Sequence, residues 1–105
     1  MRNKARFTVT IDATYSIKGQ ISRQKECQIT DLSSSGARVR FPGTEILGSG
    51  AVIVMDIAIP NTIMRIATEA EIMWTRHRFN EFLSGIRFTG ALSENMVRQL
   101  VKKTP

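Results

Sequence analysis

The chain has 105 residues, a length typical of one domain, and 42% of them are hydrophobic, which excludes a disordered or fibrous protein. Fifteen lysines and arginines against nine acidic residues give a formal net charge of +6, which favours anionic partners such as phosphate-bearing ligands. The single cysteine, Cys27, excludes an internal disulfide, and the lack of a long apolar stretch predicts a cytoplasmic protein that does not insert into a membrane.

The first half of the chain predicts three strands. Residues 7–17 alternate between apolar and polar side chains with a period of two, which indicates a half-buried strand. A turn around Gly19 leads to a return strand over residues 21–30, so the two segments predict a hairpin. After an interruption, the alternation resumes in a short strand over residues 37–41.

The second half predicts three more strands. Residues 51–59 are nearly all apolar, as expected of a strand covered on both faces. Residues 63–74 alternate again, and Trp74 shares the inward parity of its neighbours in this pattern, which favours core packing for its ring. Residues 82–89 form the last predicted strand.

The C-terminal segment, residues 93–104, predicts one short amphipathic helix. Ser93 can cap its N-terminus, and Leu92 and Val97 stand at the two positions of a hydrophobic staple. Six strands joined by turns and one closing helix predict an all-β domain, an antiparallel barrel or sandwich, in which residues 7–90 form the β-structure.

The sequence offers little for catalysis or metal binding. His77 is the only histidine and lies in the segment TRHRFNE, which predicts a solvated turn residue. One histidine and one cysteine are too few for a metal site, and Glu69 and Glu71 on one strand face are typical of a solubilising surface. We therefore expect a protein that is not an enzyme and that carries no metal or cofactor.

Two short motifs contain residue types that a core does not need. Arg2 and Arg6 form an RxxxR element ahead of the first strand, and Asp31, Ser33 and Gly36 form DxSxxG between the second and third strands. Arginine can hold a phosphate or the O6 and N7 edge of guanine in a bidentate manner, and a carboxylate can accept hydrogen bonds from guanine N1 and N2. Gly36 permits a positive φ, which would let the loop turn tightly and expose its amides. A solvated tail and an ordinary polar turn are the alternatives.

The order and spacing of these motifs resemble the PilZ domain family. The resemblance extends over essentially the whole chain, from RxxxR through DxSxxG to the GIRF of residues 85–88 and the closing helix. It implies a six-stranded antiparallel β-barrel with one C-terminal α-helix, preceded by a flexible arm over residues 1–6. It also implies that the ligand is the bacterial second messenger cyclic di-GMP, which has two guanines and two phosphates in a ring.

The resemblance also assigns roles to the motif residues. Arg2 and Arg6 would clamp a phosphate and the outer edge of a guanine, and the arm would become ordered against the barrel. Asp31 and Ser33 would read the other guanine, and Gly36 would leave room for the ligand. Because only Met1 precedes Arg2, one bound molecule is favoured over a stacked pair.

Two more residues are candidates for ligand contacts. Arg38 follows the DxSxxG motif on the outward parity and can reach a phosphate, although outward arginines on strands are common. Trp74 can stack on a guanine if its ring is accessible.

Three functions remain open at this point. The first is a cyclic di-GMP receptor that signals to a protein partner, and the second is a PilZ-like adaptor that works through protein contacts without a ligand. The third is a small-barrel nucleic-acid-binding protein. The outward positions carry few aromatic residues, so no nucleic-acid partner is expected.

Overall fold

The computed structural model describes residues 6–20, 24–43 and 47–103. These residues form six strands and one helix: β1 (Phe7–Ile17), β2 (Lys25–Leu32), β3 (Gly36–Pro42), β4 (Val52–Ala58), β5 (Arg65–Arg78), β6 (Glu81–Phe88) and α1 (Glu94–Lys103). The strands and the helix follow the predicted order along the chain.

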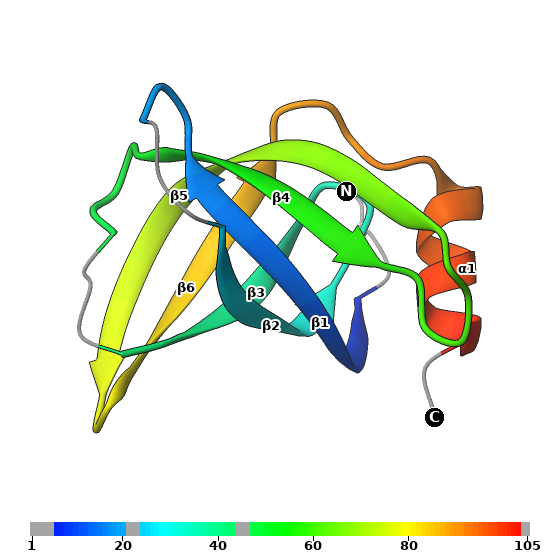
Figure 1. The fold of residues 1–105 in the computed structure, drawn as a ribbon, viewed down its shortest axis with the longest axis horizontal. Helices are drawn as coiled ribbons and strands as arrows, with labels where there is room; N and C mark the ends of the chain where they lie inside the picture. The colour runs from blue at the N-terminus through cyan, green and yellow to red at the C-terminus, as the bar shows by residue number, and fades with distance from the viewer. Residues whose placement is uncertain (1–5, 21–23, 44–46, 104–105) are drawn as a thin grey trace.

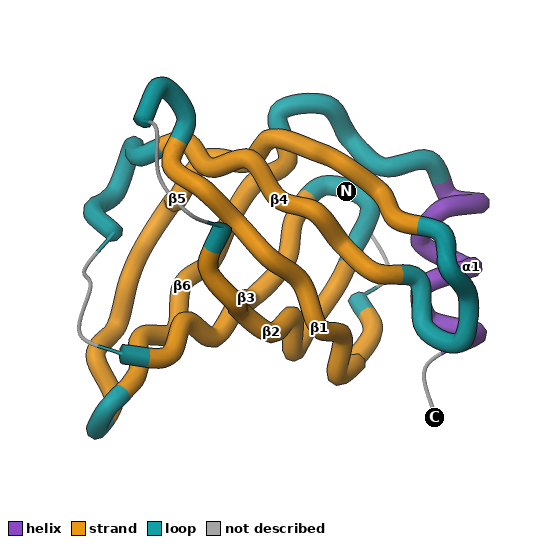
Figure 2. Tube along the Cα trace, in the orientation of Figure 1, coloured by secondary structure: helices purple, strands orange, loops and turns teal. Residues whose placement is uncertain are grey.

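The six strands close into an antiparallel barrel. Strands β1, β2 and β3 form one meander and β4, β5 and β6 a second, and the two meanders join where β3 pairs with β6 and β1 pairs with β4. Figure 1 shows the strands crossing around a shared interior, and Figure 2 shows that loops and the helix lie at the two ends. The predicted six-stranded barrel with one C-terminal helix is confirmed, and closure leaves no unpaired sheet edge.

The strand boundaries correct two details of the sequence prediction and leave the start of the second strand untested. Strand β2 is described from Lys25, and residues 21–23 of the predicted strand lie outside the described residues. Strand β4 is buried on one face and only half-buried on the other, so it is not covered on both faces. Strand β5 continues to Arg78, so His77 lies in a strand and not in the turn, with its ring centroid 4.8 Å from that of Phe82.

The barrel interior holds the core. The inward rows of the six strands are mostly apolar, with the buried Ser84 of β6 as an exception, and the largest apolar side chains with almost no exposure are Phe41, Ile11, Ile29, Leu32, Ile53, Met55, Ile57, Ile72 and Leu100. Tyr15 and Phe41 meet edge to face inside it, with ring centroids 4.8 Å apart. This packed interior leaves binding to the outer surface of the barrel.

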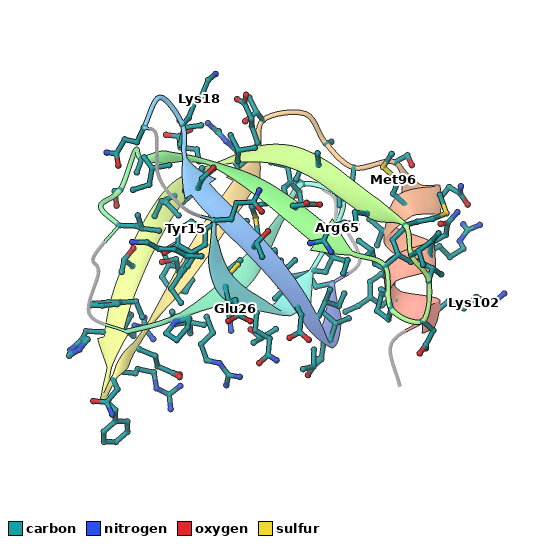
Figure 3. The ribbon with its side chains drawn as sticks, viewed as in Figure 1. Tyr15, Lys18, Glu26, Arg65, Met96 and Lys102 are labelled. Atoms are coloured by element: carbon teal, nitrogen blue, oxygen red, sulfur yellow. The ribbon has the colours of Figure 1, made fainter. Side chains whose placement is uncertain are left out.

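Helix α1 covers one end of the barrel (Figure 1). The Ser93 hydroxyl accepts a hydrogen bond from the Met96 N–H at 3.1 Å, which is the predicted N-cap. Leu92 and Val97, the predicted staple pair, are both buried in the core. Lys102 extends away from the barrel, as Figure 3 shows, so the helix is amphipathic as expected.

An extra residue in β2 changes the direction of its last side chains. Ile29 pairs with Val39, but Asp31 pairs with Arg38, so two steps along β2 match one step along β3. Thr30 is therefore the extra residue of a β-bulge. Without it, Asp31 would share the inward parity of Ile29, whereas the bulge aligns Asp31 with the outward Arg38.

A second bulge has the same effect on β5. Ile72 pairs with Ile86 and Trp74 pairs with Gly85, so Met73 is the extra residue. The inward position that we predicted for Trp74 from its parity is therefore wrong, because the bulge reverses the alternation. The Trp74 side of β5 faces outward, and the residue is 37% exposed.

Cys27 lies inside the barrel on β2 and is 5% exposed. Burial, and secondarily the negative charge of Asp12, raises the pKa of its thiol to about 12. Because the thiolate is the reactive species, the folded protein should hold this thiol in an inert form at neutral pH.

We therefore predict that Cys27 resists a thiol-specific disulfide reagent at pH 8 while the protein is folded. Addition of guanidinium chloride should expose the thiol and release one equivalent of the chromophore, measured by absorbance. Rapid stoichiometric reaction of the native protein would contradict the buried position of Cys27 in β2.

Candidate ligand-binding site

A row of four outward positions crosses four neighbouring strands. Asp31 on β2 pairs with Arg38 on β3, Arg38 pairs with Gly85 on β6, and Gly85 pairs with Trp74 on β5. Adjacent strands lie about 4.8 Å apart, so the row spans about 14 Å. The two bulges turn the Asp31 carboxylate outward at one end of the row and the Trp74 indole outward at the other.

The two sequence motifs meet at one end of the row. The Arg6 Nε–H donates to the Asp31 Oδ1 at 3.0 Å, an ion pair between side chains that are 50% and 22% exposed. An exposed pair of this kind contributes about 1 kcal/mol or less, so a charged ligand can replace it. Arg6 thus contacts β2 through Asp31, whereas Arg2 and the rest of the predicted arm, residues 1–5, lie outside the described residues.

Ser33 stabilises the loop between β2 and β3 and is fully buried. Its hydroxyl donates to the Gly36 carbonyl and accepts from the Gly36 N–H, both at 3.2 Å. It also lies 3.3 Å from the Ser35 hydroxyl. These contacts use the hydroxyl within the loop, so a direct ligand contact of Ser33 stays a prediction.

Gly36 is required by a close approach and not by its backbone conformation. Positive φ angles occur at Gly19, Gly43 and Gly50, but not at Gly36, so that part of the expectation is wrong. A Cβ at this position would lie 2.2 Å from the Ile86 carbonyl oxygen. The glycine therefore lets β3 and the DxSxxG loop lie against β6.

Gly85 allows the Trp74 ring to lie across β6. A Cβ on Gly85 would lie 2.2 Å from the Trp74 Nε1 and 2.4 Å from its Cε2. The indole therefore covers the glycine directly, and Gly85 itself is buried although it is on the outward face. A glycine one strand away from a tryptophan carries no sequence signal by itself, so our reasoning from the residues missed this pairing.

A pocket of about 370 Å³ lies over the row, on the outer surface of the barrel. It brings together residues from the N-terminal segment and from β3, β5 and β6, and it is lined by Arg6, Ala37, Arg38, Met73, Trp74, Gly85 and Ile86. Three of the predicted site residues, Arg6, Arg38 and Trp74, thus contribute to one pocket. Asp31 reaches its edge through the ion pair with Arg6.

The pocket is surrounded by cationic groups with unused donors. Arg38 is exposed, and its side chain has no hydrogen bond or ion pair within the described part of the chain. The Arg6 pair uses the Nε–H and leaves the terminal NH₂ groups available. Arg76 lies over the Trp74 ring, 5.7 Å from its centroid, a distance that gives a cation–π attraction.

The two glutamates on β5 form surface ion pairs. Glu69 accepts from Lys18 at 3.1 Å and Glu71 accepts from Arg87 at 2.8 Å.

Within residues 6–20, 24–43 and 47–103, no group of three or more His, Cys, Asp or Glu side chains is placed to hold a metal ion. No helix in those ranges is long and apolar enough to cross a bilayer.

Comparisons with known proteins agree with this architecture. A family model described as the PilZ domain matches residues 1–103. Among solved structures, the Bacillus subtilis inhibitor of motility MotI/DgrA aligns with a TM-score of 0.74 at 14% sequence identity, which shows a shared fold. The alignment covers 97% of this chain and 48% of that chain, so this chain spans about half the length of that protein. No curated protein matches the sequence.

The two glycines of the site should respond differently to alanine. Gly36→Ala places a methyl group against the backbone of β6, so we predict a loss of about 1–3 kcal/mol in the free energy of unfolding. In Gly85→Ala the atoms nearest to the added methyl group belong to the Trp74 side chain, which can move, so this variant should cost less stability but shift the tryptophan emission towards the red. Urea denaturation and fluorescence spectra measure both effects.

Gly90→Ala is the matched control, because a Cβ there meets no atom within 4 Å. Its stability and emission should equal those of the wild type. Equal stability of Gly36→Ala and Gly90→Ala would contradict the close approach of β3 to β6.

Proposed function

Because the chain belongs to the PilZ domain family, we propose that it binds cyclic di-GMP at the pocket over β3, β5 and β6 and passes the signal to a protein partner. The observation that carries this proposal is the ion pair between Arg6 and Asp31, because it joins RxxxR to DxSxxG beside the pocket. In this proposal the chain acts as a binding and regulatory domain and not as an enzyme.

In the proposed complex, Arg6 and Asp31 exchange their mutual contact for contacts with the ligand. The Arg6 guanidinium binds a phosphate or the O6 and N7 edge of one guanine, and Arg2 contributes to the same clamp. The Asp31 carboxylate accepts hydrogen bonds from N1 and N2 of the other guanine. The weak existing pair supports this exchange, because it aligns both groups at little cost in free energy.

The opposite wall of the pocket supplies stacking and charge. The exposed face of the Trp74 ring stacks on a guanine, and the Arg38 guanidinium binds a phosphate. The ring lies across Gly85, which has no side chain to displace it. Both residues were candidates from sequence, and their shared pocket strengthens the case for them.

The loop residues act mainly by shaping the site. Ser33 and Gly36 fix the DxSxxG loop through the hydrogen bonds of the serine hydroxyl and the close contact with β6. Gly36 leaves room for β6, and a fixed loop holds Asp31 in place for the ligand. Ordering of the arm, residues 1–6, over the bound ligand is the proposed conformational change that a partner recognises.

We predict that isothermal titration calorimetry detects cyclic di-GMP binding to the wild-type chain. Arg6→Ala should weaken binding by roughly tenfold or more, because a bidentate contact contributes on the order of 1–3 kcal/mol. Its thermal unfolding without ligand should change little, because the pair with Asp31 is exposed. Asp31→Ala should also lose affinity, because it removes the carboxylate that accepts hydrogen bonds from guanine N1 and N2.

Arg38→Ala should also weaken binding, and Arg40→Ala provides its matched control. Arg40 is a second outward arginine of β3, but it pairs with Glu81 at 3.8 Å and does not line the pocket. GMP and cyclic di-AMP are the nucleotide controls. If the wild-type protein gives no binding heat and no NMR shift with cyclic di-GMP, the ligand-independent adaptor is favoured. If it binds any nucleic acid with a steep salt dependence, a nucleic-acid-binding function is favoured.

Trp74 provides an optical test of the same site, since it is the only tryptophan. Stacking of a guanine on the indole should quench its emission on titration with cyclic di-GMP. The midpoint of this titration should agree with the dissociation constant from calorimetry. Trp74→Leu should bind about tenfold more weakly, because a stacked base contributes on the order of 1–3 kcal/mol. Unchanged emission at saturation would remove Trp74 from the site.

A further inference from the structure

The hairpin between β5 and β6 ends in an exposed aromatic side chain. Phe79 and Asn80 connect the strands, and Phe79 is 88% exposed. Figure 1 shows the hairpin projecting at the end of the barrel opposite α1. The turn is tied to the barrel because the Gly43 N–H donates to the Asn80 carbonyl at 2.9 Å.

The backbone at Phe79 is in a conformation that a bulky side chain rarely adopts. Its φ is 51°, in the left-handed region that glycine and asparagine enter more easily. Asn80, the next residue, has no positive φ. The large ring thus occupies the position where folding alone would favour a small residue, which points to a role for the ring outside the fold.

Basic side chains stand behind the ring. Arg76 and Arg78 lie on one face of β5, and neither has a carboxylate partner within the described ranges. At about 3.3 Å per residue they lie about 10 Å and about 3 Å behind Phe79 along the strand. The nearest acidic residue of the hairpin, Glu81, is paired with Arg40.

We propose that this hairpin tip, residues 76–81, is a contact site for an anionic phospholipid bilayer. A headgroup layer is about 5–8 Å thick, so a ring at the hydrocarbon boundary places both arginines at or near the phosphates. The contact is interfacial and does not span the membrane. It extends beyond the proposed nucleotide binding and uses none of the residues that line the pocket.

A bilayer fits the tip better than a protein pocket does. A specific protein interface requires about 800 Å² from each partner, which a two-residue turn cannot provide alone. A lipid surface needs no complementary shape, and it offers an apolar layer beneath a layer of negative charge. The separation between Phe79 and the arginines matches that order of layers.

Vesicle co-sedimentation of the full chain, without nucleotide, tests the proposal. The wild type should bind vesicles made of equal parts phosphatidylglycerol and phosphatidylcholine at low salt, and should not bind pure phosphatidylcholine. Phe79→Gly should reduce the partition coefficient about tenfold while unfolding at the same or a higher temperature, because glycine relieves the φ of the turn. Arg76→Ser and Arg78→Ser should each reduce it roughly fivefold.

Ile63→Ser is the matched control, because Ile63 is 99% exposed in the loop between β4 and β5 and lies outside the hairpin. Its vesicle binding should equal that of the wild type. The proposal is overturned if the wild type does not bind the anionic vesicles, or if Phe79→Gly binds as well as the wild type. It is also overturned if Ile63→Ser causes the same loss. Calorimetry with cyclic di-GMP on Phe79→Gly should be unchanged, so failure here leaves the nucleotide site standing.

Discussion

The outer face of this barrel acquires its binding chemistry from two extra residues in its strands. In a regular strand, Asp31 would follow Ile29 into the core and Trp74 would follow Ile72. A charged carboxylate in that interior would lose its hydration without gaining a partner, which is strongly unfavourable. The bulges at Thr30 and Met73 avoid this cost by reversing the alternation, and the pocket depends on that reversal.

Two glycines allow close contacts at the site, one between β3 and β6 and one between β6 and the Trp74 ring. At Gly36 the neighbour is backbone, so the DxSxxG loop is fixed against β6 and has little freedom. At Gly85 the neighbour is the Trp74 side chain, so the pocket floor can adjust through one ring. The pocket therefore has a rigid side near the DxSxxG loop and an adaptable side at the Trp74 ring.

Much of the fold could be predicted from sequence because it rests on local patterns. Period-two alternation located the strands, and Ser93 with the staple pair located the helix. The position of Trp74 could not be predicted, because a bulge is a relation between two strands and leaves no mark on the pattern of one. The same holds for Gly36, whose requirement comes from Ile86, fifty residues away in the chain. RxxxR and DxSxxG identified the candidate site residues, but not their meeting in one ion pair.

The two ends of the row make different kinds of contact with their surroundings. On the carboxylate side, the Ser34 carbonyl accepts from the Leu92 N–H and the Ser35 carbonyl from the Phe88 N–H, both at 2.8 Å, so the loop is joined to the start of α1 through the backbone. On the aromatic side, Trp74 contacts Arg76 through a cation–π attraction alone. A planar ligand on the indole would compete with Arg76 for the ring. The loop on the carboxylate side, in contrast, is held to the start of α1 by backbone hydrogen bonds.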